Sequence, residues 1–414
     1  MDRWLVCISV SLLVIIYIFL ASNLRYRRVE KENDRLRTLY PDDASLARMT
    51  NEDAHDIIKY LQQYEFPFAF EVSLAASLYR PYGIPSIARV LAKTKQFADV
   101  HLASKRSADT AVLVVDFAQN PPESGKCCGA ISRMNYIHRA YQKAGVIKDE
   151  DLLYTLALLA WLPVKFIERY EWRQLTLIEL QAAGVFWKSL GDAMNLSYIG
   201  LASAPPDDGL TPRSAGGWRD GLHFLTELCE WSEQYEIENM RPHHLNHKAA
   251  AETEPILLYG IPEPLQNLGR QALSAVMDER LRRALMLNDP PKLVEKAVFG
   301  ALQLRRFYLR YFSLPRFRPH LRVTQKADVN GRFHRTTWAA QPWYVKPSVS
   351  NRWRWQAWKE WLTGRPLPGD DGIKPEGYTH EEVGPAKFEG RGKEDFVQER
   401  ERLMMMGRGG CPFG

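Results

Sequence analysis

His138 is a residue whose surroundings in the sequence could support chemistry. At helical spacing it shares one face with Ile131, Met134 and Tyr141. An imidazole on such an apolar face could ligate a haem iron through one ring nitrogen, while an acceptor held the other. The alternative is a hydrogen-bonded histidine of the core.

A polar cluster lies earlier, at residues 105–110. Asp109 and Thr110 follow Arg106 by three and four positions, so the three side chains can share one helical face just before an apolar run. A guanidinium, a carboxylate and a hydroxyl at one place could position dioxygen and supply or relay a proton. The alternative is a capping network at the start of a helix, with Ser107 or Asp109 as the cap.

Three more histidines, His243, His244 and His247, fall within a short segment. This density suggests a metal site, such as non-haem iron or copper. The segment 241–255 is predicted to be a polar loop, however, so a solvated loop is the alternative reading. The sequence contains no Walker loop, dinucleotide fingerprint, serine-hydrolase elbow or HExxH motif.

The elements that must position these residues read as helices. Thr50 can cap a helix that follows it, and the four residues from Thr176 form a capping box. The segment 151–162 is apolar all round, which is typical of a central buried helix that starts at Asp149 or Asp151. Strand-type alternation is scarce, and the sequence therefore predicts an all-α fold.

Residues 4–21 form an uncharged apolar run. In a helix this run spans about 27 Å, just enough for the hydrocarbon core of a bilayer. A cleavable signal peptide is the alternative, but the basic leader is nearly absent and no small-x-small cleavage site follows. We therefore predict a transmembrane anchor at 1–24, a charged helical stalk at 25–38, one large helical domain at 39–362 and an irregular tail at 363–414, with a long loop at 202–217.

Charge and cysteine usage indicate where the domain resides. Positive residues cluster directly after the span, beginning with Arg25, Arg27 and Arg28, and this pattern predicts that the domain faces the cytosol. The five cysteines show no repeated spacing, which favours a reducing compartment. The net charge of +6 comes from basic residues interleaved with acids, so no nucleic-acid partner is expected.

Seven segments carry a resemblance to a known family. In chain order they are residues 65–87, 105–111 (KRSADTA), 151–175, 186–196 (FWKSLGDAMNL), 277–285, 342–353 (PWYVKPSVSNRW) and 385–394 (PAKFEGRGKE). With them, nearly the whole chain resembles the MpaB-type ER-bound oxygenases of fungal natural-product pathways, such as the mycophenolic acid pathway. That group shares a catalytic domain with the bacterial rubber oxygenases.

The resemblance implies an all-helical enzyme that uses oxygen to cleave a carbon–carbon double bond in an isoprenoid chain. In the rubber oxygenases the cofactor is haem b with one axial histidine. Their motif of Arg, Thr and a later axial His matches Arg106, Thr110 and His138. The residue before the Thr is basic in the bacterial enzymes, whereas this chain has Asp109. A catalytic Glu that precedes the Arg in those enzymes has no counterpart that we can place.

The expected protein is thus a single-pass ER membrane oxygenase acting on the terpenoid chain of a secondary metabolite of the meroterpenoid type. Haem b would be held by His138, with O2 as co-substrate. Arg106 and Thr110 would orient bound oxygen or a haem propionate, and Asp109 would handle protons. Two alternatives stay open at this point. One is a non-haem metal oxygenase that uses His243, His244 and His247. The other is a non-enzymatic, membrane-tethered isoprenoid-binding protein.

Overall fold

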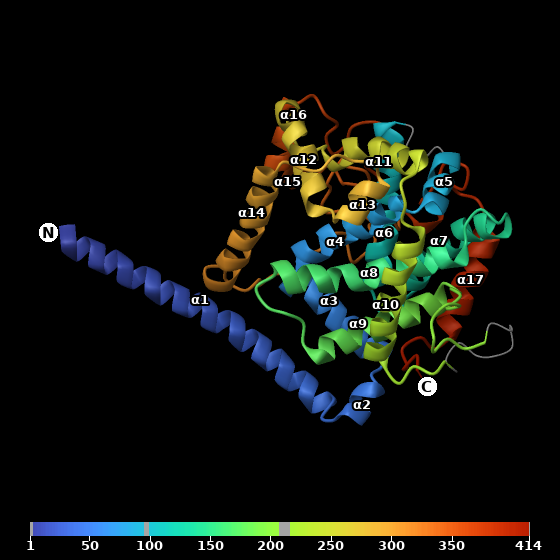
Figure 1. The fold of residues 1–414 in the computed structure, drawn as a ribbon, viewed down its shortest axis with the longest axis horizontal. Coiled ribbons are helices and arrows are strands. Elements are labelled where there is room, and N and C mark those ends of the chain that lie inside the picture. The colour runs from blue at the N-terminus through green and yellow to red at the C-terminus, as the bar shows by residue number, and fades with distance from the viewer. Residues whose placement is uncertain (1–2, 95–98, 207–215, 414) are drawn as a thin grey trace.

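The computed structural model describes residues 3–94, 99–206 and 216–413 (Figure 1). Within these ranges the chain forms 17 α-helices and no β-strand. Three isolated bridges lie between residues 323 and 378. The predicted all-α fold is confirmed.

The first α-helices in chain order are α1 (Arg3–Leu39), α2 (Asp43–Ala47), α3 (Asn51–Tyr60), α4 (Pro67–Tyr79), α5 (Pro85–Thr94), α6 (Val100–Gln119), α7 (Gly125–Lys143), α8 (Asp149–Tyr170) and α9 (Leu177–Ala193). They are followed by α10 (Gly221–Asn239), α11 (His244–Leu257), α12 (Gln266–Val276), α13 (Glu279–Ala284), α14 (Lys292–Tyr311), α15 (Val349–Arg352), α16 (Trp355–Leu362) and α17 (Lys393–Met405). Short turns of other helix types are η1 (Leu61–Glu65), η2 (Arg80–Gly83), η4 (Glu263–Leu265) and η5 (His380–Glu382).

Helix α1 joins the anchor and the stalk without a break. Its apolar outer part extends away from the rest of the molecule, and it is the one described helix long and apolar enough to cross a membrane (Figure 1). Its charged part packs on the domain through buried Arg25 and Leu36. One long helix therefore connects the span rigidly to the domain.

The predicted caps are present. The side chain of Thr50 accepts a hydrogen bond from the backbone of Asp53 at the start of α3. Thr176 and Glu179 form the capping box of α9. Helix α8 begins at Asp149 and passes through the middle of the domain, packed between α4, α9 and α10.

Helices α9 and α10 cross at two glycines. A Cβ atom at Gly184 would lie only 1.8 Å from the carbonyl oxygen of Gly221. The two backbones can approach this closely because neither residue carries a side chain. This crossing sets the position of α10, whose Tyr235 and Glu236 contact α8 and whose Glu236 also binds Arg80 of η2.

Two irregular stretches can be compared with the sequence expectations. The predicted loop at 241–255 is wrong, because α11 starts at His244, and buried Asn246, Ala249, Ala250 and Thr253 give it a packed face. In the predicted loop at 202–217, the described positions are not helical, and residues 207–215 lie outside the described part.

The tail at 363–414 is mostly irregular, yet it also contains α17. This helix packs against α7 and buries Phe396 and Leu403. The buried guanidinium of Arg133 on α7 donates to the carbonyl oxygens of Val383, Phe388 and Arg391. The tail is thereby tied to the helix that carries His138.

Candidate active site

A cavity of about 340 Å³ lies among α4, α5, α6, α7, α8, α9 and α11. Arg106, Asp109, Thr110 and His138 all line it, so the fold brings together four residues that the sequence placed on two separate helices. Most of the wall is apolar, and its side chains include Leu78, Leu113, Val114, Phe117, Leu156, Leu159, Leu190, Ile256 and Leu257. Such walls suit a hydrophobic ligand.

The polar cluster lies in the interior of α6. This helix is capped by Asp99, whose carboxylate accepts from the backbone of Leu102, so residues 106–110 lie beyond its first turn. The alternative reading, in which Ser107 or Asp109 caps a helix, is therefore wrong. The helical repeat turns Arg106, Asp109 and Thr110 toward the cavity together.

Asp109 is buried and bound by two side chains. Its carboxylate accepts hydrogen bonds from the hydroxyl of Tyr344 (2.6 Å) and from the ammonium of Lys105 (2.9 Å). Lys105 also donates to the carbonyl oxygen of Gly384, which lines the cavity. Burial raises the pKa of Asp109, while Lys105 and Tyr344 act in the opposite direction. These contacts connect α6 to the C-terminal part of the chain.

His138 faces the cavity from α7, beside Met134 and Tyr141. Burial and, to a smaller extent, the nearby charge of Arg106 lower its pKa to about 4. The imidazole is therefore neutral near pH 7, which is the form that ligates a metal. Among the described residues, neither ring nitrogen has a hydrogen-bond partner.

A small second pocket of about 110 Å³ also borders His138. Asn135, Arg139 and Gln142 line it together with Asn195. His138 thus borders both the large apolar cavity and a small pocket whose lining is partly polar. The acceptor expected from the sequence for the second ring nitrogen is not seen among the described side chains, but this pocket puts polar groups near the ring.

Asp151 is a cavity residue that sequence reasoning missed. It is 5% exposed and lines the cavity from the first turn of α8. Ser86 and Tyr235 both donate to its Oδ1 at 2.8 Å, whereas Oδ2 has no hydrogen-bond partner among the described residues. Burial raises its pKa. In the sequence, Asp151 was interpreted as a residue that starts a helix. The one feature that could have indicated a role in the cavity was a carboxylate placed directly before a wholly apolar helix.

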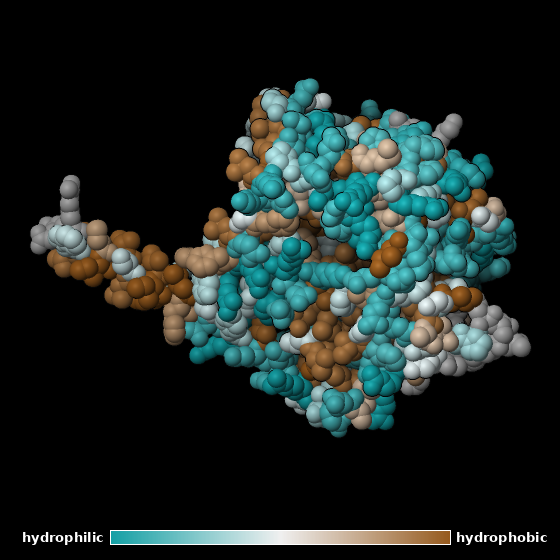
Figure 2. Space-filling model, viewed as in Figure 1, coloured by the Kyte–Doolittle hydropathy of each residue, from teal (hydrophilic) through white to brown (hydrophobic). Residues whose placement is uncertain are grey.

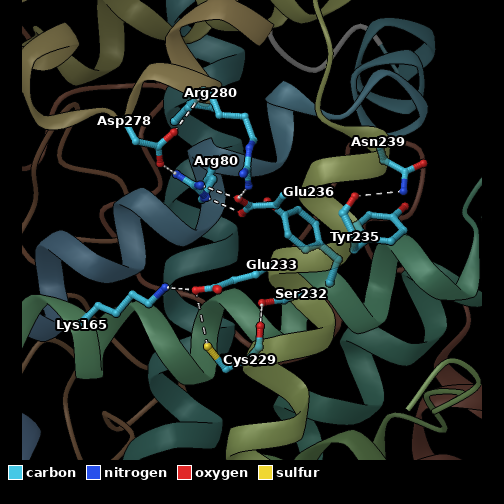
Figure 3. Close-up of polar contacts among 12 residues, drawn as sticks. Arg80, Lys165, Cys229, Ser232, Glu233, Tyr235, Glu236, Asn239, Asp278 and Arg280 are labelled. Atoms are coloured by element: carbon cyan, nitrogen blue, oxygen red, sulfur yellow. Dashed lines mark hydrogen bonds and ion pairs between the residues drawn. The ribbon is translucent and has the colours of Figure 1, made fainter. Parts of the chain in front are cut away.

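A buried ionic cluster supports the end of the cavity next to α4. Tyr79, Pro81 and Tyr82 line the cavity, and Arg80 between them points away into the cluster. Figure 3 shows Arg80 between Glu236 of α10 and Asp278. Its guanidinium binds both oxygens of Glu236 at 2.6 Å, and the hydroxyl of Tyr154 donates to the same carboxylate. The bidentate pair fixes η2 against α10.

The three histidines of α11 lie apart from this cavity. His243 caps the helix, its Nδ1 accepting from the backbone of Leu245, and its ring stacks on that of His244. The Nδ1 of His247 lies 3.0 Å from the carbonyl oxygen of Leu285. Across the described ranges, no three His, Cys, Asp or Glu side chains are grouped as a metal site.

No family model matches the chain. It is 40% identical over 402 residues to an ER-bound oxygenase MpaB′ from Penicillium brevicompactum, covering 96% of this chain and 92% of that protein. It is 37% identical to an ER-bound oxygenase MpaB from the same organism, covering 86% and 82%. A protein of the same name from Penicillium roqueforti is 40% identical over 274 residues, covering 66% and 88%. The chain therefore belongs to the MpaB family of ER-bound oxygenases and is a membrane-associated oxidoreductase.

Proposed function

We propose that this oxygenase uses haem b and O2 to cleave a carbon–carbon double bond in the isoprenoid chain of a small secondary metabolite. The observation that carries the proposal is His138, a neutral imidazole without a protein partner among the described residues, in the wall of an apolar cavity. Arg106 and Thr110 lie on the facing helix α6. An acyclic terpenoid tail matches the apolar wall in chemistry.

The residues around the cavity fit a haem in their chemistry. His138 supplies a neutral nitrogen donor, the aliphatic wall suits a porphyrin, and Arg106 supplies a cation for a propionate. Haem would contribute the activation of O2, which no side chain in this cavity can perform alone. A non-haem metal site at His243, His244 and His247 would need the three imidazoles to point at one metal ion. In the structure these side chains are instead bound in a helix cap, a ring stack and a backbone contact.

The protein groups divide the remaining tasks. Leu113, Phe117 and Leu159 exclude water from the reacting chain and hold its alkene. Thr110 can donate its hydroxyl proton to an oxygen atom in the cavity. Asp109 lines the cavity and is bound to Lys105 and Tyr344, so both of these groups can exchange a proton with its carboxylate. We propose that Asp109 positions α6 and handles protons at the cavity wall.

Absorption spectroscopy with pyridine haemochrome analysis tests the cofactor assignment. We expect the full-length protein, expressed with ample haem, to show a Soret band that is lost in His138→Ala. A triple alanine variant at His243, His244 and His247 is the matched control and should keep its haem. A wild-type protein without a Soret band would reject the haem proposal, and a band that survives in His138→Ala would reject His138 as the ligand.

Oxygen uptake tests the reaction itself. A prenylated aromatic compound should stimulate O2 consumption by the wild-type protein and yield a shortened product with a new carbonyl group. Arg106→Ala and Thr110→Val should bind haem but turn over slowly. Binding of the compound without any O2 consumption would instead favour a membrane-tethered isoprenoid-binding protein.

We also propose that the span crosses the ER membrane once, with the domain in the cytosol. The basic residues Arg25, Arg27 and Arg28 directly follow the apolar run, and such residues stay on the cytosolic side. The four cysteines after the span, in the domain and the tail, are free thiols in the structure, which agrees with a reducing compartment.

A further inference from the structure

Helix α14 is unusual because none of its 20 residues is buried. An apolar stripe follows the helical repeat through Leu293, Ala297, Leu304, Phe307 and Tyr308, and all five side chains are exposed. Leu293 is 80% exposed and Leu304 68%. A second stripe carries Lys296, Gln303 and Arg310. This pattern of apolar and basic faces is typical of a helix that lies in a membrane interface.

Helix α16 and Trp353, the residue directly after α15, repeat the pattern with tryptophan. Trp353, Trp355, Trp358, Trp361 and Leu362 are all exposed, and Trp355 is 80% exposed. The other side of α16 packs inward, since Ala357 and Glu360 are buried. Tryptophan is enriched at membrane interfaces, where the ring meets both lipid and water.

The anchor fixes the depth of this surface. The hydroxyl of Tyr17, inside the apolar span, donates to the carbonyl oxygen of Phe312 at 2.8 Å, directly after α14. Arg25 binds Ser313 and Leu314, and Arg28 binds the carbonyl oxygen of Arg316. Tyr17 lies four residues before the end of the span at Ala21, which corresponds to about 6 Å along the helix. The end of α14 therefore lies at the level of the lipid headgroups or just below.

The arrangement of the helices agrees with this depth. Figure 1 shows α14, α15 and α16 on the side of the domain that faces the free apolar end of α1. Figure 2 shows apolar side chains along that end of α1 and at the edge of the domain over α14 and α16. The exposed stripes and the anchor thus share one side of the molecule.

We infer that α14 and α16 form a second membrane-contacting surface, which rests in the headgroup region of the bilayer that α1 spans. The occupant of this surface is lipid. Its apolar and tryptophan side chains enter the interface, and the basic residues Lys296, Arg310, Arg316 and Arg318 meet lipid phosphates. The contact gives the domain a second attachment to the bilayer beside α1. The inference rests on the anchor and these exposed faces, and it is independent of the proposed reaction.

Lipid quenching of a site-specific fluorophore tests the inference in the full-length protein. Bimane is attached to Phe307→Cys or Trp355→Cys, with Glu394→Cys on α17 as the control position. Cys7→Ser and Cys411→Ser remove the span thiol and the partly exposed tail thiol from the background. The protein is reconstituted into phosphatidylcholine–phosphatidylserine vesicles containing a lipid with a nitroxide high on its acyl chain.

We expect quenching at 307 and 355 to exceed that at 394 severalfold. Leu304→Cys, one turn from Phe307, should show the same quenching. This second position on the stripe controls for a change in structure caused by the substitution at 307. Equal quenching at all positions would overturn the inference. A blue-shifted bimane at 307 that nitroxide lipid does not quench would also overturn it, because a second copy of the protein would then cover the surface.

Discussion

His138 makes the stability of the folded chain depend on pH. Its pKa falls from the ordinary value of 6.5 to about 4, so between these values the unfolded chain binds a proton that the folded chain does not. Stability is therefore fully present above pH 6.5 and is lost as the pH falls toward 4. For protein without haem, this side chain should remove roughly 2 kcal/mol of unfolding free energy between pH 8 and pH 5.

Urea unfolding in detergent at the two pH values measures this effect. His138→Gln should lose about that much less stability than the wild type on acidification. Burial also lowers the pKa of His55 to about 4. The wild type and His138→Gln should therefore share a further loss of stability on acidification that comes from His55. Identical pH dependence in wild type and His138→Gln would show that the ring can be protonated inside the fold.

We expect the buried carboxylate of Asp151 to lower the stability of the folded protein and to take part in substrate binding. Burial raises the pKa of its carboxyl group, and one carboxylate oxygen has no hydrogen-bond partner among the described residues, so the charged form is less stable here than in water. Asp151→Asn removes that charge and should raise the unfolding free energy by about 1 kcal/mol. If Oδ2 accepts a hydrogen bond from a polar group of the substrate, kcat/KM should fall about tenfold.

Thermal unfolding and steady-state kinetics of the same preparation decide between these roles. Asp149→Asn is the matched control, because Asp149 is exposed on the same first turn of α8. It should leave both quantities nearly unchanged. A more stable Asp151→Asn variant with normal kcat/KM would mean that Asp151 does not contact the substrate.

At the scale of elements, Arg80 holds η2 against α10. In the described part of the chain, Arg80→Ala leaves buried Glu236 with only Tyr154 and the more distant Arg280 as partners. Losing one partner of a buried ion pair should lower the unfolding free energy by about 3–5 kcal/mol. The pair Lys165–Glu233 in Figure 3 is the control. Its lysine is 45% exposed, so Lys165→Ala should cost less than about 1 kcal/mol.

The crossing of α9 and α10 gives a second prediction at this scale. Gly184→Ala places a methyl group against the backbone of Gly221, so the helices must separate and the unfolding free energy should fall by about 3 kcal/mol or more. Gly300→Ala is the counterpart, since a Cβ there meets nothing within 4 Å. On exposed α14 it should instead stabilise the protein by up to about 1 kcal/mol. Denaturant titration of both variants would measure the contrast, and a loss of stability in both would contradict it.

At the scale of the whole molecule, the orientation of the anchor decides which compartment supplies the substrate. A protease added to sealed microsomes should digest the domain completely without detergent, because the proposed topology places the domain in the cytosol. A lumenal ER protein serves as the control and should be digested only after detergent is added. Protection of the domain, or a glycan on Asn195 within Asn195-Leu196-Ser197, would reverse the topology.

The sequence by itself determined the features that depend on neighbouring residues. Capping at Thr50 and Thr176 and the all-round apolar character of α8 are local properties, and these helices formed as predicted. The spacing of Arg106, Asp109 and Thr110 fixed their common face, because the helical repeat is set by the backbone alone. The apolar run of α1 could likewise be identified from the sequence alone.

Only the tertiary structure decided which of these faces meet. Tyr344 reaches Asp109 from 235 positions away, and Tyr235 reaches Asp151 from 84 positions away. Such pairs leave no local pattern, because they depend on how helices cross and on where close-packed glycines let them approach. Helix α11 was missed for a related reason, since the buried residues within 244–255 are Asn246, two alanines and Thr253, which carry little hydrophobic signal. Whether the apolar stripe of α14 is buried in a core or left exposed was likewise decided by packing, because a core and a bilayer select the same residues.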